Sequence, residues 1–176
     1  MADDPTIFYR SGTVNDMFQI LDLYSRLYQG FYSDPTVIDP IMFRKSFSSE
    51  NIIWAIAVAN GQIIGSMNFT MDFGNGLTKV SGAVVDPKFQ SRGVALELLR
   101  RGIKNINEQY PGQEIFFGCV RTLTSAPQKL TAQLNFRTIG IFPNIHRTQI
   151  YETQILTALF SERSLKQRDT NFKSHP

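Results

Sequence analysis

The stretch VVDPKFQSRGVALELL, residues 84–99, holds the residues best suited to chemistry in this sequence. An Asp-Pro pair ends a strand there, and a helix is expected to begin near Ser91 to Gly93. The first N–H groups of a helix lack partners and lie at the positive end of its dipole, so they bind a phosphate or pyrophosphate well. Gly93 lets a ligand approach the backbone without meeting a Cβ, and Arg92 can add a cation. A Gly-x-Ala pair before a helix also suits tight helix packing, so both interpretations stay open.

Apolar spacing on both sides of this stretch predicts the elements that must position it. The helix that follows ends at Pro111-Gly112, and its apolar positions are Val94, Leu98, Leu99, Ile103 and Ile106. Before it, Asn60-Gly61 is the strongest short hairpin signal, and Gly74-Asn75-Gly76 makes a second turn. The three antiparallel strands that these turns join are expected at Ile52–Ala59, Gln62–Met71 and Leu77–Val85. The strand predicted after the helix, Ile115–Val120, completes a strand–helix–strand unit and should run parallel to the third strand.

The amino-terminal part adds a strand and two helices. Ile7–Arg10 can form a strand, and Thr13 with Asp16 makes an imperfect capping box for a helix. The apolar face expected for that helix is Val14, Phe18, Leu21 and Tyr28. Asp39-Pro40 looks like an N-cap followed by proline at the first helical position, which predicts a short helix through Phe47.

The carboxy-terminal part completes the order of elements. Ser125 and Gln128 have capping-box spacing, and with Pro127 they predict a short helix to Leu134. The last two strands are expected at Arg137–Ile141 and Gln149–Leu159. The whole order predicts a mixed α/β (α+β) fold: a mostly antiparallel sheet of about seven strands with four helices on its faces.

Composition narrows the class of protein. The chain has 176 residues, a net charge of +3 and 42% hydrophobic residues, which is typical of one globular domain. No apolar run approaches the roughly 20 residues that cross a bilayer, and the acidic start MADDPTIFYR lacks a signal-peptide core. We therefore expect a cytoplasmic protein with no membrane partner. Cys119 is the single cysteine, and His146 and His175 have no metal-ligand spacing, so neither a disulfide nor a metal site is expected.

Residues 161–176 form a polar, basic tail after a domain of residues 1–160. Its cations are Arg163, Lys166, Arg168 and Lys173. A solvated tail explains them, and no nucleic-acid partner is expected because no recognised binding module is visible. Nucleic-acid or surface binding through the tail remains an alternative, and it would be strongly salt-dependent.

Residues 90–95, Gln-Ser-Arg-Gly-Val-Ala, resemble the Q/R-x-x-G-x-G/A signature of the GNAT superfamily of N-acetyltransferases. The preceding Val-Asp-Pro and Phe89 are typical of that family, and the predicted order of elements is similar to its fold from about Ile7 to about Phe160. The resemblance implies a GNAT domain that moves an acetyl group from acetyl-CoA, or another short acyl-CoA, to an amine by direct attack in a ternary complex. The acceptor would be an amine-bearing small molecule or a peptide or protein, and a homodimer is compatible with the family.

The resemblance also implies which residues bind CoA. In that family the fourth and fifth strands splay apart, so the backbone of Ala83 to Val85 would pair with the pantetheine amides. Ser91 to Leu96 would cradle the pyrophosphate, and Thr124 falls where many relatives carry an asparagine that bonds the cofactor. The implied set is Ala83, Val84, Val85, Gln90, Ser91, Arg92, Gly93, Val94, Ala95, Leu96 and Thr124.

Two positions depart from the family pattern. Thr131 stands where many relatives have a tyrosine as general acid, and Cys119 stands where some have a glutamate base. Cys119 is expected to be a small core residue. His146, in the predicted loop between the last two strands, has a pKa class that suits a base, although an exposed loop histidine is the simpler explanation. Tyr151 could replace the phenol, or it could be a core residue of its strand.

The acceptor side is less defined by the sequence. Phe31 and Tyr32, in the loop between the first helices, either line an acceptor pocket or pack. Asp72 either attracts a cationic amine or is a solvated carboxylate in a turn. Because the usual acid and base are missing, the sequence also allows a binding module that holds CoA without turnover.

Overall fold

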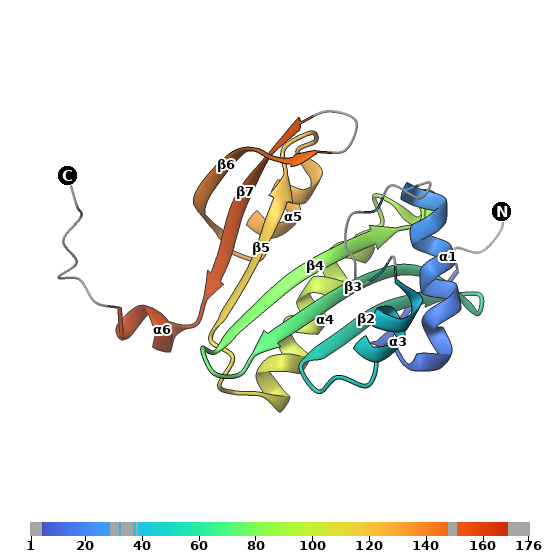
Figure 1. Ribbon diagram of the computed structural model, residues 1–176, viewed down its shortest axis with the longest axis horizontal. Helices are drawn as coiled ribbons and strands as arrows, with labels where there is room; N and C mark the ends of the chain where they lie inside the picture. The colour runs from blue at the N-terminus through green and yellow to red at the C-terminus, as the bar shows by residue number, and fades with distance from the viewer. Residues whose placement is uncertain (1–4, 29–31, 33–36, 38, 148–150, 169–176) are drawn as a thin grey trace.

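The structure is a computed structural model, and it describes residues 5–28, 32, 37, 39–147 and 151–168. Its centre is one seven-stranded sheet in the order β1-β2-β3-β4-β5-β7-β6 (Figure 1). The strands are β1 (Phe8–Ser11), β2 (Ile52–Ala59), β3 (Gln62–Asp72), β4 (Leu77–Val85), β5 (Ile115–Arg121), β6 (Arg137–Arg147) and β7 (Tyr151–Phe160). Neighbouring strands pair antiparallel except β4 and β5, which run parallel. The predicted mixed sheet and its parallel pair are confirmed.

Helices cover both faces of the sheet in Figure 1. A 3₁₀ turn η1 (Val14–Asp16), α1 (Met17–Tyr28) and α3 (Pro40–Ser46) lie on one face, and α4 (Val94–Gln109) lies on the other. The short turn η2 (Pro87–Phe89) precedes α4, α5 (Ala126–Ala132) follows β5, and α6 (Glu162–Lys166) follows β7. One buried cluster joins α1 and α3 to β2, and a second joins α4 to β2 and β3. The amino-terminal half of the sheet is therefore packed on both sides.

Local signals explain why several elements begin and end where they do. Asn60 (φ 49°) and Gly61 (φ 74°) both have positive φ, which a two-residue hairpin turn with the correct twist requires. Asp39 caps α3, because its carboxylate accepts the N–H groups of Ile41 (2.7 Å) and Met42 (3.1 Å). Both elements were predicted from these residues.

The start of α1 is held by an ion pair that the sequence did not reveal. The buried carboxylate of Asp16 accepts the backbone N–H of Thr13 at 2.8 Å, which completes the predicted capping box. It also accepts both terminal nitrogens of Arg10, at 2.7 and 2.8 Å. Hydrogen bonding to Arg10 is the largest cause that lowers the pKa of Asp16 to about 2. The pair fixes α1 to the end of β1.

The apolar face predicted for the first helix was only half right, since Leu21 and Tyr28 pack against the core as partly buried residues, whereas Val14 and Phe18 do not. Phe18 is 76% exposed and Val14 is also exposed, whereas Ile20 and Leu23 are fully buried. Both sets have helical spacing, so the pattern alone cannot choose between them. The sheet decides, because α1 packs against Trp54 and Ile56 of β2 through the second set.

Two carboxy-terminal expectations also need correction. β6 continues to Arg147 instead of ending at Ile141. His146 therefore lies in a strand and not in a loop, and its backbone pairs with Glu152 of β7. Ser125 makes no side-chain cap for α5, because its own backbone is already helical. Within the described residues, no helix is long and apolar enough to cross a membrane.

Candidate functional site

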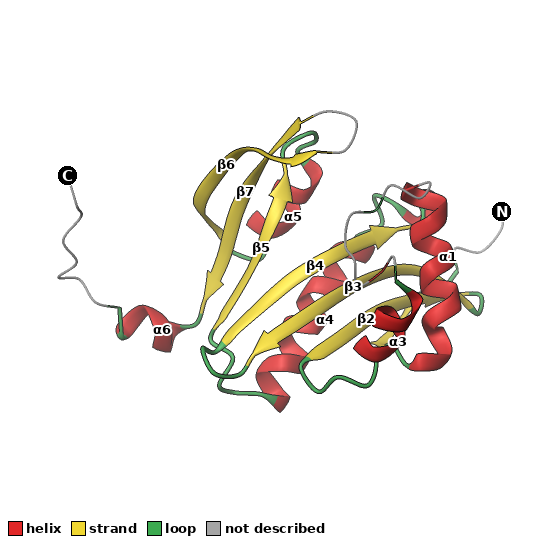
Figure 2. Cartoon of the chain, in the orientation of Figure 1, coloured by secondary structure: helices red, strands yellow, loops and turns green. Residues whose placement is uncertain are grey.

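The sheet opens between β4 and β5. Only three register pairs join the two strands, and the last of them is Lys79 with Phe117. Just beyond it the strands are still close, because a Cβ on Gly118 would lie 2.8 Å from the carbonyl oxygen of Val80. From there β5 pairs with β7 alone as far as Arg121, while β4 continues beside β3 (Figure 2). Among the described residues, no strand pairs with the edge of β4 that faces this gap.

A β-bulge shapes β4 at the gap. Ser81 pairs with Asn68 and Val84 with Ser66, so two residues of β4 oppose a single residue of β3. One of the two is Gly82, whose φ is +65°. A Cβ at Gly82 would lie 2.6 Å from the Tyr24 hydroxyl oxygen, so only glycine fits there.

Side chains from two elements fasten this bulge. The Tyr24 hydroxyl, on α1, donates a hydrogen bond to the carbonyl oxygen of Gly82. On the neighbouring strand, Asn68 is buried and accepts the Ser81 hydroxyl at 2.6 Å. Tyr24 therefore holds the bulged backbone directly, and the bond between Ser81 and Asn68 ties β4 to β3 beside it, which preorganises the amide groups of β4 at the gap.

The start of α4 lies at the wide end of the gap. Its first helical hydrogen bond runs from the Glu97 N–H to the Gly93 carbonyl at 3.0 Å. The N–H groups of Val94, Ala95 and Leu96 precede that bond and have no acceptor within the helix. Gly93 has φ +75°, and a Cβ placed on it would meet nothing within 4 Å. The helix mouth is thus open, with the geometry and the partial charge that suit a diphosphate.

The loop that leads to α4 is tied to its surroundings. Asp86 accepts the Lys88 N–H at 3.0 Å and a nitrogen of Arg26, on α1, also at 3.0 Å. These contacts, the Lys88 N–H first, lower the pKa of Asp86 below its ordinary value. The guanidinium of Arg92 lies 5.2 Å from the centre of the Phe89 ring, which keeps a cation near the helix mouth.

The wall formed by β5 is anchored by a buried ion pair. Glu152 of β7 is almost fully buried, and its two oxygens accept two nitrogens of Arg121 at 2.5 and 2.6 Å. Burial raises the pKa of the Tyr28 phenol on α1, and the nearby charge of Arg121 partly opposes this increase. These residues place α1, β5 and β7 around one end of the gap.

Three tyrosines four residues apart, Tyr24, Tyr28 and Tyr32, gather beside the bulge. Their ring centres are 4.6 to 6.2 Å apart, and Tyr24 also packs edge-on against Trp54. Sequence reasoning missed Tyr24 and placed Tyr28 on a merely apolar face. The spacing of Tyr24 and Tyr28 was the available signal, since residues four apart share one face of a helix.

Comparison with known proteins decides the family. Residues 17–132 match the model of a family described as "Acetyltransferase (GNAT) family". The chain belongs to the GNAT family. Among curated proteins, no match is found.

Solved GNAT structures share the fold at low sequence identity. An N-acetyltransferase from Staphylococcus aureus Mu50 is 18% identical, with a TM-score of 0.76 over 88% of this chain and 98% of that one. The ribosomal-protein-S18-alanine N-acetyltransferase from Escherichia coli is 19% identical, with a TM-score of 0.73 over 96% and 100%. A structure of yncA from Salmonella typhimurium with acetyl-CoA is 15% identical, with a TM-score of 0.72 over 88% and 93%. At these identities the likeness establishes the fold alone.

The structure shows where the residues implied by GNAT resemblance lie. Ala83 to Val85 form the end of β4, and Gln90 to Leu96 follow as the loop and first turn of α4, so these two groups adjoin the gap. The Gln90 amide lies 3.4 Å from the Val85 carbonyl oxygen. Thr124 is exposed in the loop between β5 and α5, across the gap. Among the described residues, no group of three His, Cys, Asp or Glu side chains could hold a metal ion.

Thr131 and Cys119, the two positions that depart from the GNAT pattern, lie in different surroundings. Thr131 is buried, and its hydroxyl lies 3.0 Å from the Gln128 carbonyl and 3.3 Å from the Pro127 carbonyl of its own helix. Such a hydroxyl is unsuited to protonating a thiolate. Cys119 is exposed, so its expected place in the core was wrong. Cys119 shares one face of the sheet with Phe117 and Arg121, because side chains two apart on a strand point the same way. This is the face that carries α1, but α1 and α3 do not extend over β5 in Figure 1.

The remaining candidates fall at different places. Tyr151 begins β7, is 60% exposed and packs under the Arg147 guanidinium at 5.2 Å, so it is not a core residue. Phe31 lies outside the described residues, whereas Tyr32 belongs to the tyrosine group beside Gly82. Asp72 ends β3, where its carboxylate accepts both the N–H and the side-chain amide of Asn75, at 3.1 and 2.8 Å. These bonds lower the pKa of Asp72, the Asn75 side chain first.

Proposed function

We propose that this GNAT protein transfers an acetyl group from acetyl-CoA to an amine. The observation that carries the proposal is the gap between β4 and β5, which opens directly beside the unobstructed start of α4. A diphosphate at Gly93 and a pantetheine arm along the free edge of β4 would occupy adjoining sites. This arrangement suits CoA because its diphosphate is anionic and its arm offers amides that pair like a strand.

The proposed reaction is a direct transfer in a ternary complex. The neutral amine attacks the thioester carbonyl, a C–N bond forms, the C–S bond breaks, and CoA leaves as its thiol once a proton from the amine reaches it. An amide of the bulged segment of β4 polarises the carbonyl oxygen, and holding the two reactants together supplies much of the rate. Because the Thr131 hydroxyl is hydrogen-bonded to carbonyl oxygens of its own helix, the proton travels through water, His146 or Tyr151.

A second candidate function is a GNAT-fold module that binds CoA without turnover. Two positions favour it: Thr131, whose hydroxyl is bonded within its own helix, replaces the usual tyrosine acid, and Cys119 replaces the glutamate base of some relatives. The module would bind acetyl-CoA yet release no thiol with any amine of a broad panel. Steady thiol release with one amine rejects it.

The acceptor is an amine on a small molecule or on a peptide or protein. The similar protein from Escherichia coli is a ribosomal-protein-S18-alanine N-acetyltransferase, and a peptide amine is therefore one acceptor for the test panel. We further propose a cytoplasmic protein with its catalytic domain in residues 1–160. Removal of residues 161–176 should leave transfer intact, and salt-dependent nucleic-acid binding that disappeared on truncation would support the alternative role of the tail.

Acetyl-CoA binding is tested by calorimetric titration of Gly93→Glu against Gly61→Glu. The two glycines have φ of +75° and +74°, and neither would bring a Cβ within 4 Å of another group, so the backbone strain is matched. Only the first variant places a carboxylate at the start of α4. We expect at least a hundredfold weaker binding in Gly93→Glu and unchanged binding in Gly61→Glu. Equal affinities would show that the diphosphate binds elsewhere.

Turnover is tested separately with Tyr24→Phe. Removing the hydroxyl releases the Gly82 carbonyl while the ring stays in place, so the bulge loses one of its two fastenings. We expect about tenfold lower kcat, which corresponds to ~1.4 kcal/mol of transition-state stabilisation, with acetyl-CoA affinity unchanged. A variant that kept its kcat would mean that the bulge needs no support from α1.

A further inference from the structure

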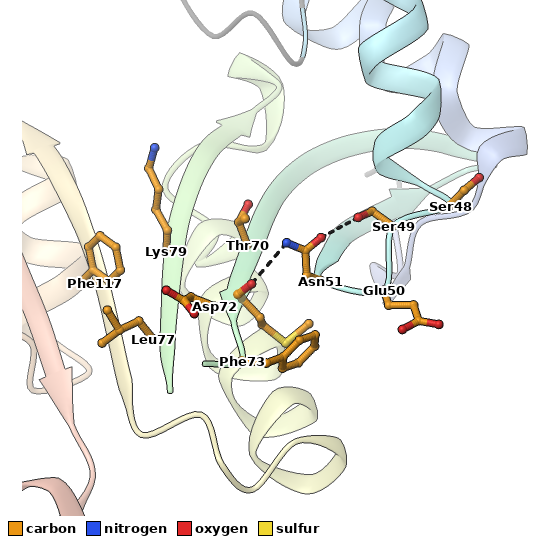
Figure 3. A pocket seen from close by; sticks show the side chains of 11 residues that line it. Ser48, Ser49, Glu50, Asn51, Thr70, Asp72, Phe73, Leu77, Lys79 and Phe117 are labelled. Atoms are coloured by element: carbon orange, nitrogen blue, oxygen red, sulfur yellow. Dashed lines mark hydrogen bonds between the residues drawn. The ribbon is translucent and has the colours of Figure 1, made fainter. Parts of the chain in front are cut away.

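A pocket lies at the narrow end of the gap, on the face of the sheet that carries α1 and α3. Its volume is about 920 Å³, which is in the range of sites for small ligands. Four segments form it: the loop from Ser48 to Asn51, the end of β3, the start of β4, and Phe117 of β5 (Figure 3). None of the residues assigned to CoA lines it.

The position of this pocket relates it to the proposed reaction. Lys79 and Phe117, which line it, are also the last register pair before β4 and β5 part. The bulge at Gly82 is three residues farther along β4, about 10 Å at the rise of a strand. A molecule in the pocket can therefore reach from Lys79 towards the segment that would hold the thioester.

Charges of opposite sign lie at different parts of the pocket. Figure 3 shows the Lys79 side chain extended along β4, away from Asp72 and Leu77. No ion pair within the described part of the chain involves Lys79. The two carboxylates of the lining belong to Asp72 and Glu50, and the Asp72 carboxylate is already bonded by Asn75. The Lys79 side chain therefore extends towards the gap, whereas Asp72 lies at the end of β3 and Glu50 lies in the loop before β2.

We propose that the acceptor is a small amino acid-like molecule whose carboxylate binds Lys79 and whose neighbouring amine receives the acetyl group. This rests on the proposed acetyl transfer and names the substrate class for it. One lysine suits a singly charged carboxylate, whereas a phosphate site usually gathers several donors or a helix start, and none of the described lining residues is an arginine.

The same charges predict how the rest of the acceptor is chosen. Its side chain points towards Asp72, Glu50 and the hydroxyl of Thr70, so a basic or amide side chain is favoured over an acidic one. Lys79 also acts on the reacting amine, because a nearby cation lowers the pKa of an ammonium group and so raises the neutral fraction that can attack.

The experiment compares pairs of acceptors that differ only in the carboxylate. Free amino acids with basic, amide and acidic side chains are assayed beside their carboxamides and beside short peptides with the same first residue. The wild-type chain should prefer each basic or amide amino acid over its carboxamide by at least tenfold in kcat/KM. In Lys79→Gln that preference should fall to about one, and Lys79→Arg should restore most of it.

Lys45→Gln is the matched control, since it removes an exposed lysine from α3, outside the pocket. It should keep the preference for carboxylates. Acetyl-CoA titration of every variant separates the two proposals: unchanged affinity in Lys79→Gln with a lost preference supports the pocket assignment. Equal rates with amino acids and carboxamides, or faster transfer to peptides, would overturn it while leaving the acetyltransferase intact. Absence of acetyl-CoA binding in the wild-type chain would instead overturn the proposed function.

Discussion

The two halves of the sheet are stabilised by different means. β1 to β4 lie between α1 and α3 on one face and α4 on the other, and nearly all buried apolar side chains belong to this half. After residue 110 the described core contains only Phe116, Val120, Phe136 and Ala158, whereas several apolar residues of β6, such as Ile141, are exposed. The carboxy-terminal half, β5 to β7 with α5, depends instead on backbone pairing and on the buried pair of Arg121 and Glu152. A firmly packed wall and a lightly packed wall therefore face each other across the gap.

The largest effect on stability is expected from a matched pair of glycine substitutions, one in each half of the molecule. A Cβ on Gly102 of α4 would lie 2.1 Å from the fully buried ring of Phe69, whereas one on Gly140 of β6 would have its nearest neighbour at 3.7 Å. We expect Gly102→Ala to lower the free energy of unfolding by about 3 kcal/mol, because α4 must move off the sheet. Gly140→Ala should change it by less than about 0.5 kcal/mol. Urea unfolding followed by circular dichroism measures both, and equal losses would refute the contrast.

A smaller effect is expected at the polar anchor of the carboxy-terminal half. Arg121→Ala removes the guanidinium that bonds both oxygens of the buried Glu152 carboxylate, and we expect a loss of about 2 kcal/mol, moderated by the partial exposure of the arginine. The double variant Arg121→Met, Glu152→Leu should recover most of that loss, since neither charge remains. If the double variant is as unstable as the single one, packing and not the ion pair anchors β7.

The smallest effect concerns Asp16 in the amino-terminal half, and it depends on pH. Its pKa of about 2 lies below the ordinary value of 3.8, so the folded state favours the carboxylate. The resulting stability is nearly complete above about pH 5 and is lost as the pH falls through 3.8 towards 2. Asp16→Asn should be less stable by about 1 kcal/mol at pH 6, the usual scale for losing a helix cap. Urea midpoints of the two proteins should converge near pH 2, and a constant difference would show that titration of Asp16 contributes nothing.

Sequence reasoning succeeded where one short segment contains the whole physical cause. Asn60-Gly61 carries the positive φ values of its turn, Asp39 lies beside the N–H groups that it caps, and α4 begins after Gly93 as expected. The same reasoning included the exposed Val14 and Phe18 in the buried face of α1, because two sets of apolar residues fit one helical period. It also ended β6 too early and placed His146 in a loop.

The sequence by itself determined the order of elements, the hairpins and the helix start that suits a diphosphate, because turns, caps and periodicity act between residues close in the chain. Tertiary structure alone decided the shape of the gap. Tyr24 and Gly82 are 58 residues apart, Arg121 and Glu152 are 31 apart, and the pocket beside Lys79 gathers four separate segments. Contacts over such separations form only when the packed sheet brings the segments together, so no local pattern encodes them.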